Sequence, residues 1–292
     1  MNLLDNFRTH FRAGNVVKRL ILINVALFLV VSVTTILLKL FRIDGGFLVN
    51  LLSVPSSPSA LLTHLWTPLT YMFFHKHFFH ILFNMLMLYW FGQLFSIYYS
   101  EKKLLSVYLF GGLIGALFFV LAYNFFPYYS DMSHRSVLMG ASGSIIALIV
   151  AAAVRAPQME VQLLLLGRVK LIWIALGMVL ISVFGLTSDN AGGELAHLGG
   201  ALAGYLFVAF EKKGKDITAF ITWIIDFFVN LFRPKPKLKK KVYHAQKMSP
   251  GEYNQKKATD EKEINRILDK IKLSGYESLT ADEKRKLFEQ KK

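Results

Sequence analysis

Six long apolar runs, separated by short polar segments, constrain the fold of this chain more than any other feature. They cover residues 20–38, 78–95, 104–126, 138–154, 171–186 and 195–210. A helix of about 20 apolar residues spans the hydrocarbon core of a bilayer. Only 18% of the residues are charged, whereas a soluble domain carries about 25%. We therefore expect an all-α membrane protein built as a bundle of six transmembrane helices.

Lysine and arginine in the short loops predict which side of the membrane each loop occupies. They are frequent before the first run and after the second and fourth runs, as at Lys18, Lys102 and Arg155, and sparser in the alternate loops. Cytoplasmic loops of membrane proteins carry an excess of these residues. The pattern predicts a multi-pass protein with both termini in the cytoplasm.

The C-terminal tail is strongly basic, since 21 of the 34 Lys and Arg residues follow Phe210. Anionic lipid head groups attract such segments, so the net charge of +15 does not require nucleic acid as a partner. The apolar stretch 217–232 contains Asp226 and is flanked by basic residues. At about 16 residues it is short for a span, and we expect an amphipathic helix in the cytoplasmic interface. A seventh span is the alternative.

These features divide the chain into five segments. They are a cytosolic N-terminus (1–17), a six-span core (18–211), an interfacial amphipathic helix (212–233), a basic linker (234–258) and a small helical cytosolic module (259–292). In the module, Ile264, Ile267 and Ile271 have the spacing of one helix face. Thr280 and Glu283 form the capping box of a second helix.

Polar side chains in or beside the apolar runs mark the candidate functional residues, because such groups are costly in lipid. They belong to the second, fourth and sixth runs and are His75, His77, His80, Asn84, Ser142 and His197. Cysteine is absent, which excludes thiolate chemistry. The three early histidines do not share one helix face and have no carboxylate near them in sequence, so we expect neither a metal site nor a cofactor.

Ser142 stands between Gly140 and Gly143 at the start of the fourth run. Small residues let membrane helices pack closely, and such packing alone would explain the motif. The alternative is that Ser142 is a nucleophile. A nucleophilic serine needs a base beside it, because the free hydroxyl is a poor nucleophile.

His197 is the candidate for that base. It shares one helix face with Gly200 and Gly204, and glycines spaced in this way allow two backbones to touch. We expect this face to pack on the glycine-flanked end of the fourth run. That contact would place the imidazole within hydrogen-bond reach of Ser142.

His80 and Asn84 lie four residues apart, on one face of the second run. An imidazole N–H and a side-chain amide can both donate to a developing oxyanion; a structural hydrogen bond between helices is the alternative. Asp131, Asp189 and Glu194 are assigned to outer loops, at spacings that demand no role. We therefore expect a dyad of serine and histidine without an acid.

The order of the motifs HxxxxHxxxN, GxSG and AHxxGxxxG resembles the rhomboid family of intramembrane serine proteases, over roughly residues 18–211. The resemblance implies a serine endopeptidase of a bacterial inner membrane that cleaves the transmembrane segments of single-span proteins. It also implies that Ser142 is the nucleophile and His197 the general base. His80 and Asn84 would line the oxyanion hole.

Further residues surround these four in the same motifs. We expect a packing role in the active site for His75, Gly140, Gly143, Gly200 and Gly204. Ile146 stands where the family commonly has an aromatic residue that stacks on the catalytic ring. Two other functions are open: a non-catalytic relative that binds transmembrane helices, and a transporter that uses the early histidines as a proton path. The intact Ser142 and His197 favour the protease.

Overall fold

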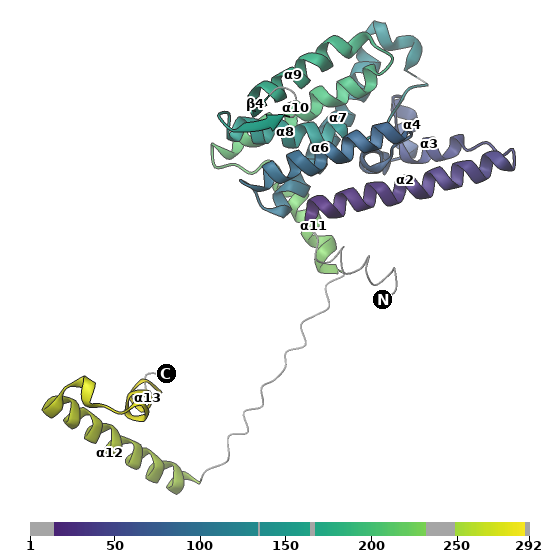
Figure 1. Ribbon diagram of the computed structural model, residues 1–292. Helices are drawn as coiled ribbons and strands as arrows, with labels where there is room; N and C mark the ends of the chain where they lie inside the picture. Colours follow the sequence, from purple (N-terminus) through teal and green to yellow (C-terminus); the bar gives the residue numbers. More distant parts are fainter. Residues whose placement is uncertain (1–14, 134, 164–166, 232–248, 290–292) are drawn as a thin grey trace. The chain divides into compact units, whose positions relative to one another are not determined.

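The computed structural model describes residues 15–133, 135–163, 167–231 and 249–289 (Figure 1). The chain divides into two compact units, Met1–Arg233 and Pro234–Lys292. In the described part, the first unit is a bundle of helices with two short β-ribbons, and the second is a pair of helices.

Four helices of the first unit are long and apolar enough to cross a membrane: α2 (Val16–Leu40), α6 (Phe78–Ser96), α7 (Glu101–Phe125) and α10 (Ala191–Glu211). The protein is therefore an integral membrane protein. Shorter apolar helices accompany them: α8 (Ser142–Arg155), α9 (Leu171–Phe184) and α11 (Ala219–Leu231). The fourth and fifth predicted spans correspond to α8 and α9, of 14 residues each, which is less than the length that a bilayer needs.

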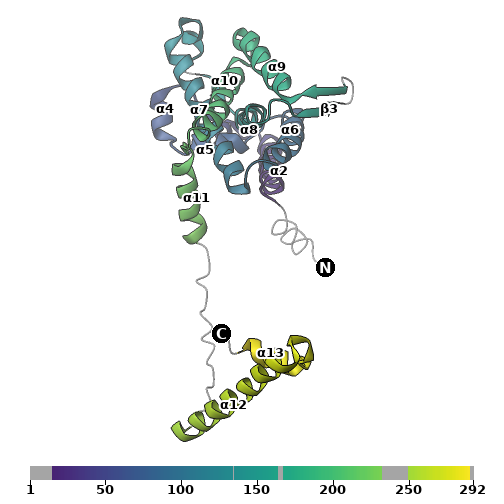
Figure 2. The same ribbon diagram turned by 90° about the vertical axis from the view of Figure 1, so that its left-hand side faces the viewer.

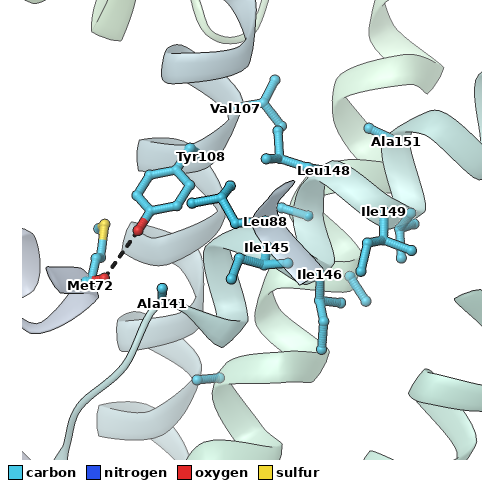
Figure 3. Packing of buried hydrophobic residues seen from close by; sticks show 14 of the residues in the cluster. Met72, Leu88, Val107, Tyr108, Ala141, Ile145, Ile146, Leu148, Ile149 and Ala151 are labelled. Carbon is cyan, nitrogen blue, oxygen red and sulfur yellow. Dashed lines mark hydrogen bonds between the residues drawn. The ribbon is translucent and has the colours of Figure 1, made fainter. Parts of the chain in front are cut away.

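The shortness of α8 has a physical reason in its surroundings. Residues 143–153 are all buried, and α6, α7, α9 and α10 pack around the helix (Figure 1 and Figure 2). Its side chains Ile145 and Leu148 join Leu88 of α6 and Val107 of α7 in the apolar core (Figure 3). A helix that is enclosed by protein does not have to match the thickness of the lipid.

Residues 137–141 before α8 are not helical, so α8 starts four residues later than the predicted span. Strand β2 (Val137–Leu138) pairs in antiparallel fashion with β1 (Val54–Pro55), which belongs to the connection between α2 and α6. That connection also contains α3 (Gly46–Leu52), α4 (Pro58–Thr63), α5 (Thr67–Thr70) and the 3-10 turn η1 (Tyr71–Phe73). The pairing of the two loops fixes where α8 begins.

The remaining connections of the first unit differ in length, and several contain short elements of their own. The antiparallel strands β3 (Glu160–Leu163) and β4 (Gly167–Lys170) join α8 to α9 and project from the bundle (Figure 2). The 3-10 turn η2 (Pro127–Met132) follows α7, and η3 (Gly185–Thr187) leads from α9 towards α10. Helices α8, α9 and α10 all contact one another, which brings them together at one site.

Helix α11 occupies most of the stretch that the sequence assigns to an amphipathic helix. One face contacts the start of α7: Thr222 Oγ1 lies 3.0 Å from Ser106 Oγ, and Lys102 Nζ lies 2.7 Å from Asp226 Oδ1. Another face exposes three aromatic side chains, Phe220, Trp223 and Phe227. A helix with an exposed aromatic face suits the membrane interface, and its location there stays a prediction.

The second unit consists of α12 (Pro250–Ser274), the 3-10 turn η4 (Tyr276–Ser278) and α13 (Ala281–Glu289). Helix α12 begins inside the predicted linker 234–258, where Ser249 and Glu252 form a capping box; the linker up to residue 248 lies outside the described residues. The predicted capping box of the second helix is present. The N–H of Thr280 donates to Glu283 Oε2 at 2.8 Å, and the N–H of Glu283 donates to Thr280 Oγ1 at 3.3 Å.

This capping box makes the second unit sensitive to acid. The backbone N–H of Thr280 and the ammonium group of Lys270 both donate to Glu283 and lower the pKa of its carboxyl from 4.5 to about 2. A carboxyl with a lowered pKa stabilises the folded state above its unfolded-state pKa, and the contribution is lost as the pH falls through the folded-state value. We therefore predict that a peptide of residues 249–292 loses helix as the pH falls from about 5 to about 2.

Circular dichroism of that peptide measures the effect. Glu283→Gln should have less helix than the parent at neutral pH and should change less in acid. Glu277 is the matched control, because its side chain is 93% exposed, and Glu277→Gln should titrate like the parent. Equal acid sensitivity of the parent and Glu283→Gln would contradict the prediction.

Candidate active site

Ser142 is the first residue of α8, and a tight turn precedes it. Gly140 has φ +115°, a conformation that L side chains rarely adopt. A Cβ atom there would lie 2.7 Å from Cε1 of the His80 ring. The predicted glycine before the serine thus serves both the turn and the close approach of a histidine from α6.

The turn is held by hydrogen bonds to Tyr71 of η1 and to His75, two residues after η1. The N–H of Gly140 donates to the carbonyl of Tyr71 at 2.9 Å, and the N–H of Ala141 donates to Nε2 of His75 at 3.3 Å. The turn η1 is itself anchored to α7, since the hydroxyl of Tyr108 donates to the carbonyl of Met72 at 3.0 Å (Figure 3). His75 is buried and contacts the backbone next to the serine, and its packing role in the active site stays a prediction.

Helices α8 and α10 touch through their backbones. A Cβ atom on Gly200 would lie 2.0 Å from the carbonyl oxygen of Gly143, and one on Gly204 would lie 2.3 Å from that of Ala147. Neither distance leaves room for a methyl group. The structure thus brings together the two glycine-bearing faces on which the sequence prediction depends, and His197 is carried to the serine end of α8.

The four predicted chemical residues line one open cavity of about 310 Å³. Ser142 comes from α8, His197 from α10, and His80 and Asn84 from α6. The other side chains that line it are apolar: Phe79, Phe83, Met87, Ile145, Ile146 and Met178. The cavity thus combines a small group of polar atoms with walls suited to an apolar chain.

Asn84 uses part of its hydrogen-bonding capacity within its own helix. Its Nδ2 donates to the carbonyl oxygen of His80 at 2.8 Å, and the residue is 7% exposed. An amide nitrogen carries two hydrogens, so one donor remains after this bond. That donor and the ring of His80 border the same cavity.

His197 has two partners that the sequence analysis missed. Its Nδ1 lies 3.1 Å from Glu194 Oε2 and 3.1 Å from Ser182 Oγ. The expectation that Glu194 lies in a loop is wrong, because α10 begins at Ala191 and contains it. An acid three residues before a histidine on one helix is a signal that sequence could have supplied; the contact from Ser182 on α9 has no such signal.

Three further expectations concern the contact between serine and histidine, the loop aspartates and a metal site. No hydrogen bond joins Ser142 to His197 in the described structure, although both line the cavity. Asp131 and Asp189 are exposed, outside the described helices α7 and α10. Among the described residues, no group of three or more His, Asp or Glu side chains is placed to hold a metal ion.

The backbone contact between α8 and α10 makes a direct prediction about stability. Gly200→Ala should destabilise the protein by about 1–3 kcal/mol, because the added methyl group forces the helices apart. Gly177 on α9 is the matched control, since a Cβ atom there meets nothing within 4 Å. Thermal unfolding in detergent should show a lower Tm for Gly200→Ala than for Gly177→Ala. Equal Tm values would show that the contact is not tight.

Comparison with protein families identifies two segments of the chain. Residues 62–213 match the Rhomboid domain, and residues 251–290, which cover most of α12 and α13, match a family of unknown function, DUF6576. No curated protein matches the chain. The first match contains all four cavity residues named above and spans slightly more than half of the 292 residues. The chain belongs to the rhomboid family of intramembrane proteases.

Proposed function

We propose that this protein is an intramembrane serine endopeptidase in which Ser142 is the nucleophile and His197 the general base. The observation that carries the proposal is that these two residues line one cavity in a rhomboid-family protein. Either ring nitrogen of a histidine can accept a proton as a base. In His197, Nδ1 already contacts Glu194 and Ser182. The other nitrogen, Nε2, is left for the serine.

The reaction follows from this assignment. His197 Nε2 takes the proton from Ser142 Oγ as Oγ forms a bond to the carbonyl carbon of the substrate. The C–N bond then breaks, and the same proton passes to the leaving amine, which leaves an acyl group on Ser142. Water then attacks the acyl carbon as His197 Nε2 takes a proton from it. The bond between the acyl carbon and Ser142 Oγ breaks, the proton passes to Oγ, and the acid product leaves the free serine.

The proposed oxyanion hole draws on three kinds of donor. His80 and Asn84 border the cavity, and the first N–H groups of α8 have no partner within the helix. The start of a helix also carries partial positive charge. Donors that are fixed before the reaction are worth more in a site with apolar walls than in water.

The apolar walls support a membrane-embedded substrate. Phe79 and Phe83 line the cavity from α6 and are 67% and 61% exposed, so an apolar chain that lies against α6 has a continuous surface to the serine. A serine protease can attack a peptide bond only where the substrate backbone is exposed to the serine, and the backbone of an intact helix is not. We therefore propose transmembrane segments of single-span proteins as the substrate class, with cleavage where the helix unwinds.

The first test of this function removes each member of the dyad. Ser142→Ala and His197→Ala should each abolish cleavage of a model transmembrane substrate by the purified protein. The losses should not be additive in the double variant, because nucleophile and base act as a unit. Tm in detergent controls for folding. Appreciable turnover by a folded Ser142→Ala variant would sink the assignment.

The second test concerns the oxyanion. Asn84→Ala should lower kcat by about 10²–10³ if the amide donates to the oxyanion. Asn24 on α2 is a close control, because its buried Nδ2 makes the same kind of bond, to the carbonyl of Leu20 at 2.8 Å. Each alanine variant should lose about 1 kcal/mol of stability, and only Asn84→Ala should lose activity. A loss of activity that follows stability equally in both would favour a structural role.

A further inference from the structure

The carboxylate of Glu194 is built into the active site. It lies in the first turn of α10, three residues before His197, with Oε2 at 3.1 Å from Nδ1 of the ring. The two side chains are only 14% and 19% exposed. Ser182 on α9 brings its hydroxyl to the same nitrogen at 3.1 Å and is itself buried. The histidine ring is therefore held at Nδ1 by two side chains.

Two glycines leave space for Glu194 and for its neighbour Asn190. A Cβ atom on Gly185 would lie 2.7 Å from Cγ of Glu194, and one on Gly193 would lie 2.7 Å from Nδ2 of Asn190. That nitrogen donates to the second oxygen of the carboxylate, Oε1, at 3.3 Å. Gly185 thus leaves space for the Glu194 side chain, Gly193 leaves space for Asn190, and the Asn190 amide holds the second carboxylate oxygen.

The contact decides where the histidine carries its proton. An ionised carboxylate can only accept hydrogen bonds, and the start of a helix favours the ionised form. A 3.1 Å contact with Glu194 then requires the proton on Nδ1, which leaves a lone pair on Nε2. That tautomer is the one that a general base must have when its Nε2 faces the nucleophile.

We propose that Glu194 is a positioning residue that completes a Ser142–His197–Glu194 arrangement. This inference rests on the function proposed above and replaces the dyad by three residues. Glu194 holds the ring in the productive tautomer and offsets the positive charge of the imidazolium that forms when Nε2 takes the serine proton. The proton moves between Ser142, His197 and the leaving amine, and never to Glu194.

A purely structural role for Glu194 is the competing explanation. An acid in the first turn stabilises a helix through the helix dipole, wherever the helix lies. Glu101 is the matched control, because it is an acid in the first turn of α7. It does not line the cavity that contains His197. Removal of either charge affects helix stability, and only removal of the Glu194 charge affects the base.

The experiment measures kcat, KM and Tm of the full-length protein in detergent with a model transmembrane substrate. Glu194→Gln keeps the size of the side chain, but its amide can donate to Nδ1 and so favours the tautomer that cannot act as base. Its kcat should fall by about 10- to 100-fold, with KM within about twofold of the parent. Glu194→Asp, which keeps the charge at a greater distance from the ring, should recover part of this loss. Glu101→Gln should keep the kcat of the parent.

The outcomes separate this inference from the function on which it rests. If the parent protein cleaves and Glu194→Gln has the same kcat, the serine protease stands and the role of Glu194 is overturned. A lower Tm for Glu194→Gln with kcat unchanged, or a rise in KM alone, also overturns it in favour of a structural or binding role. If the parent protein does not cleave while correctly folded, the proposed function fails and the inference fails with it.

Discussion

The contact between the backbones of α8 and α10 is the interaction on which the rest of the site depends. Ser142 directly precedes Gly143, and His197 precedes Gly200 by one turn, so the touching glycines bring both reactive groups to one cavity. Dispersion contacts and small residues drive such packing in a membrane, where helices gain little from the hydrophobic effect. The glycines therefore position the chemistry without any polar contact between serine and histidine in the resting structure.

A second constraint holds the turn before α8. Helix N-termini leave N–H groups without partners inside the helix, and here Tyr71 and His75 accept from the turn while β1 and β2 pair beside it. The anchoring residues come from the loop after α2, far from Ser142 in sequence. The serine thus lies between a hydrogen-bonded turn on one side and the buried body of α8 on the other.

Much of this arrangement follows from the sequence, and the exceptions have physical causes. Ser142 and His197 could be paired in advance because glycine spacing reports which helix faces approach each other. Glu194 is not found because the first turn of α10 is polar. The apolar run, and with it the predicted span, begins only at Leu195, whereas α10 begins at Ala191. Ser182 could not be found, since no motif of spaced residues on α9 marks the face that approaches His197. The first turns of α12 are likewise too polar to show a helical pattern.

The most direct measurement of the central claim is chemical identification of the nucleophile. The folded protein is treated with a fluorophosphonate probe for activated serines, and the modified residue is mapped by mass spectrometry. The account predicts that the probe modifies Ser142 and that His197→Ala, folded to the same extent, is not modified, because a serine without its base is a poor nucleophile. Modification at another serine, or labelling of Ser142 that does not depend on His197, would contradict it.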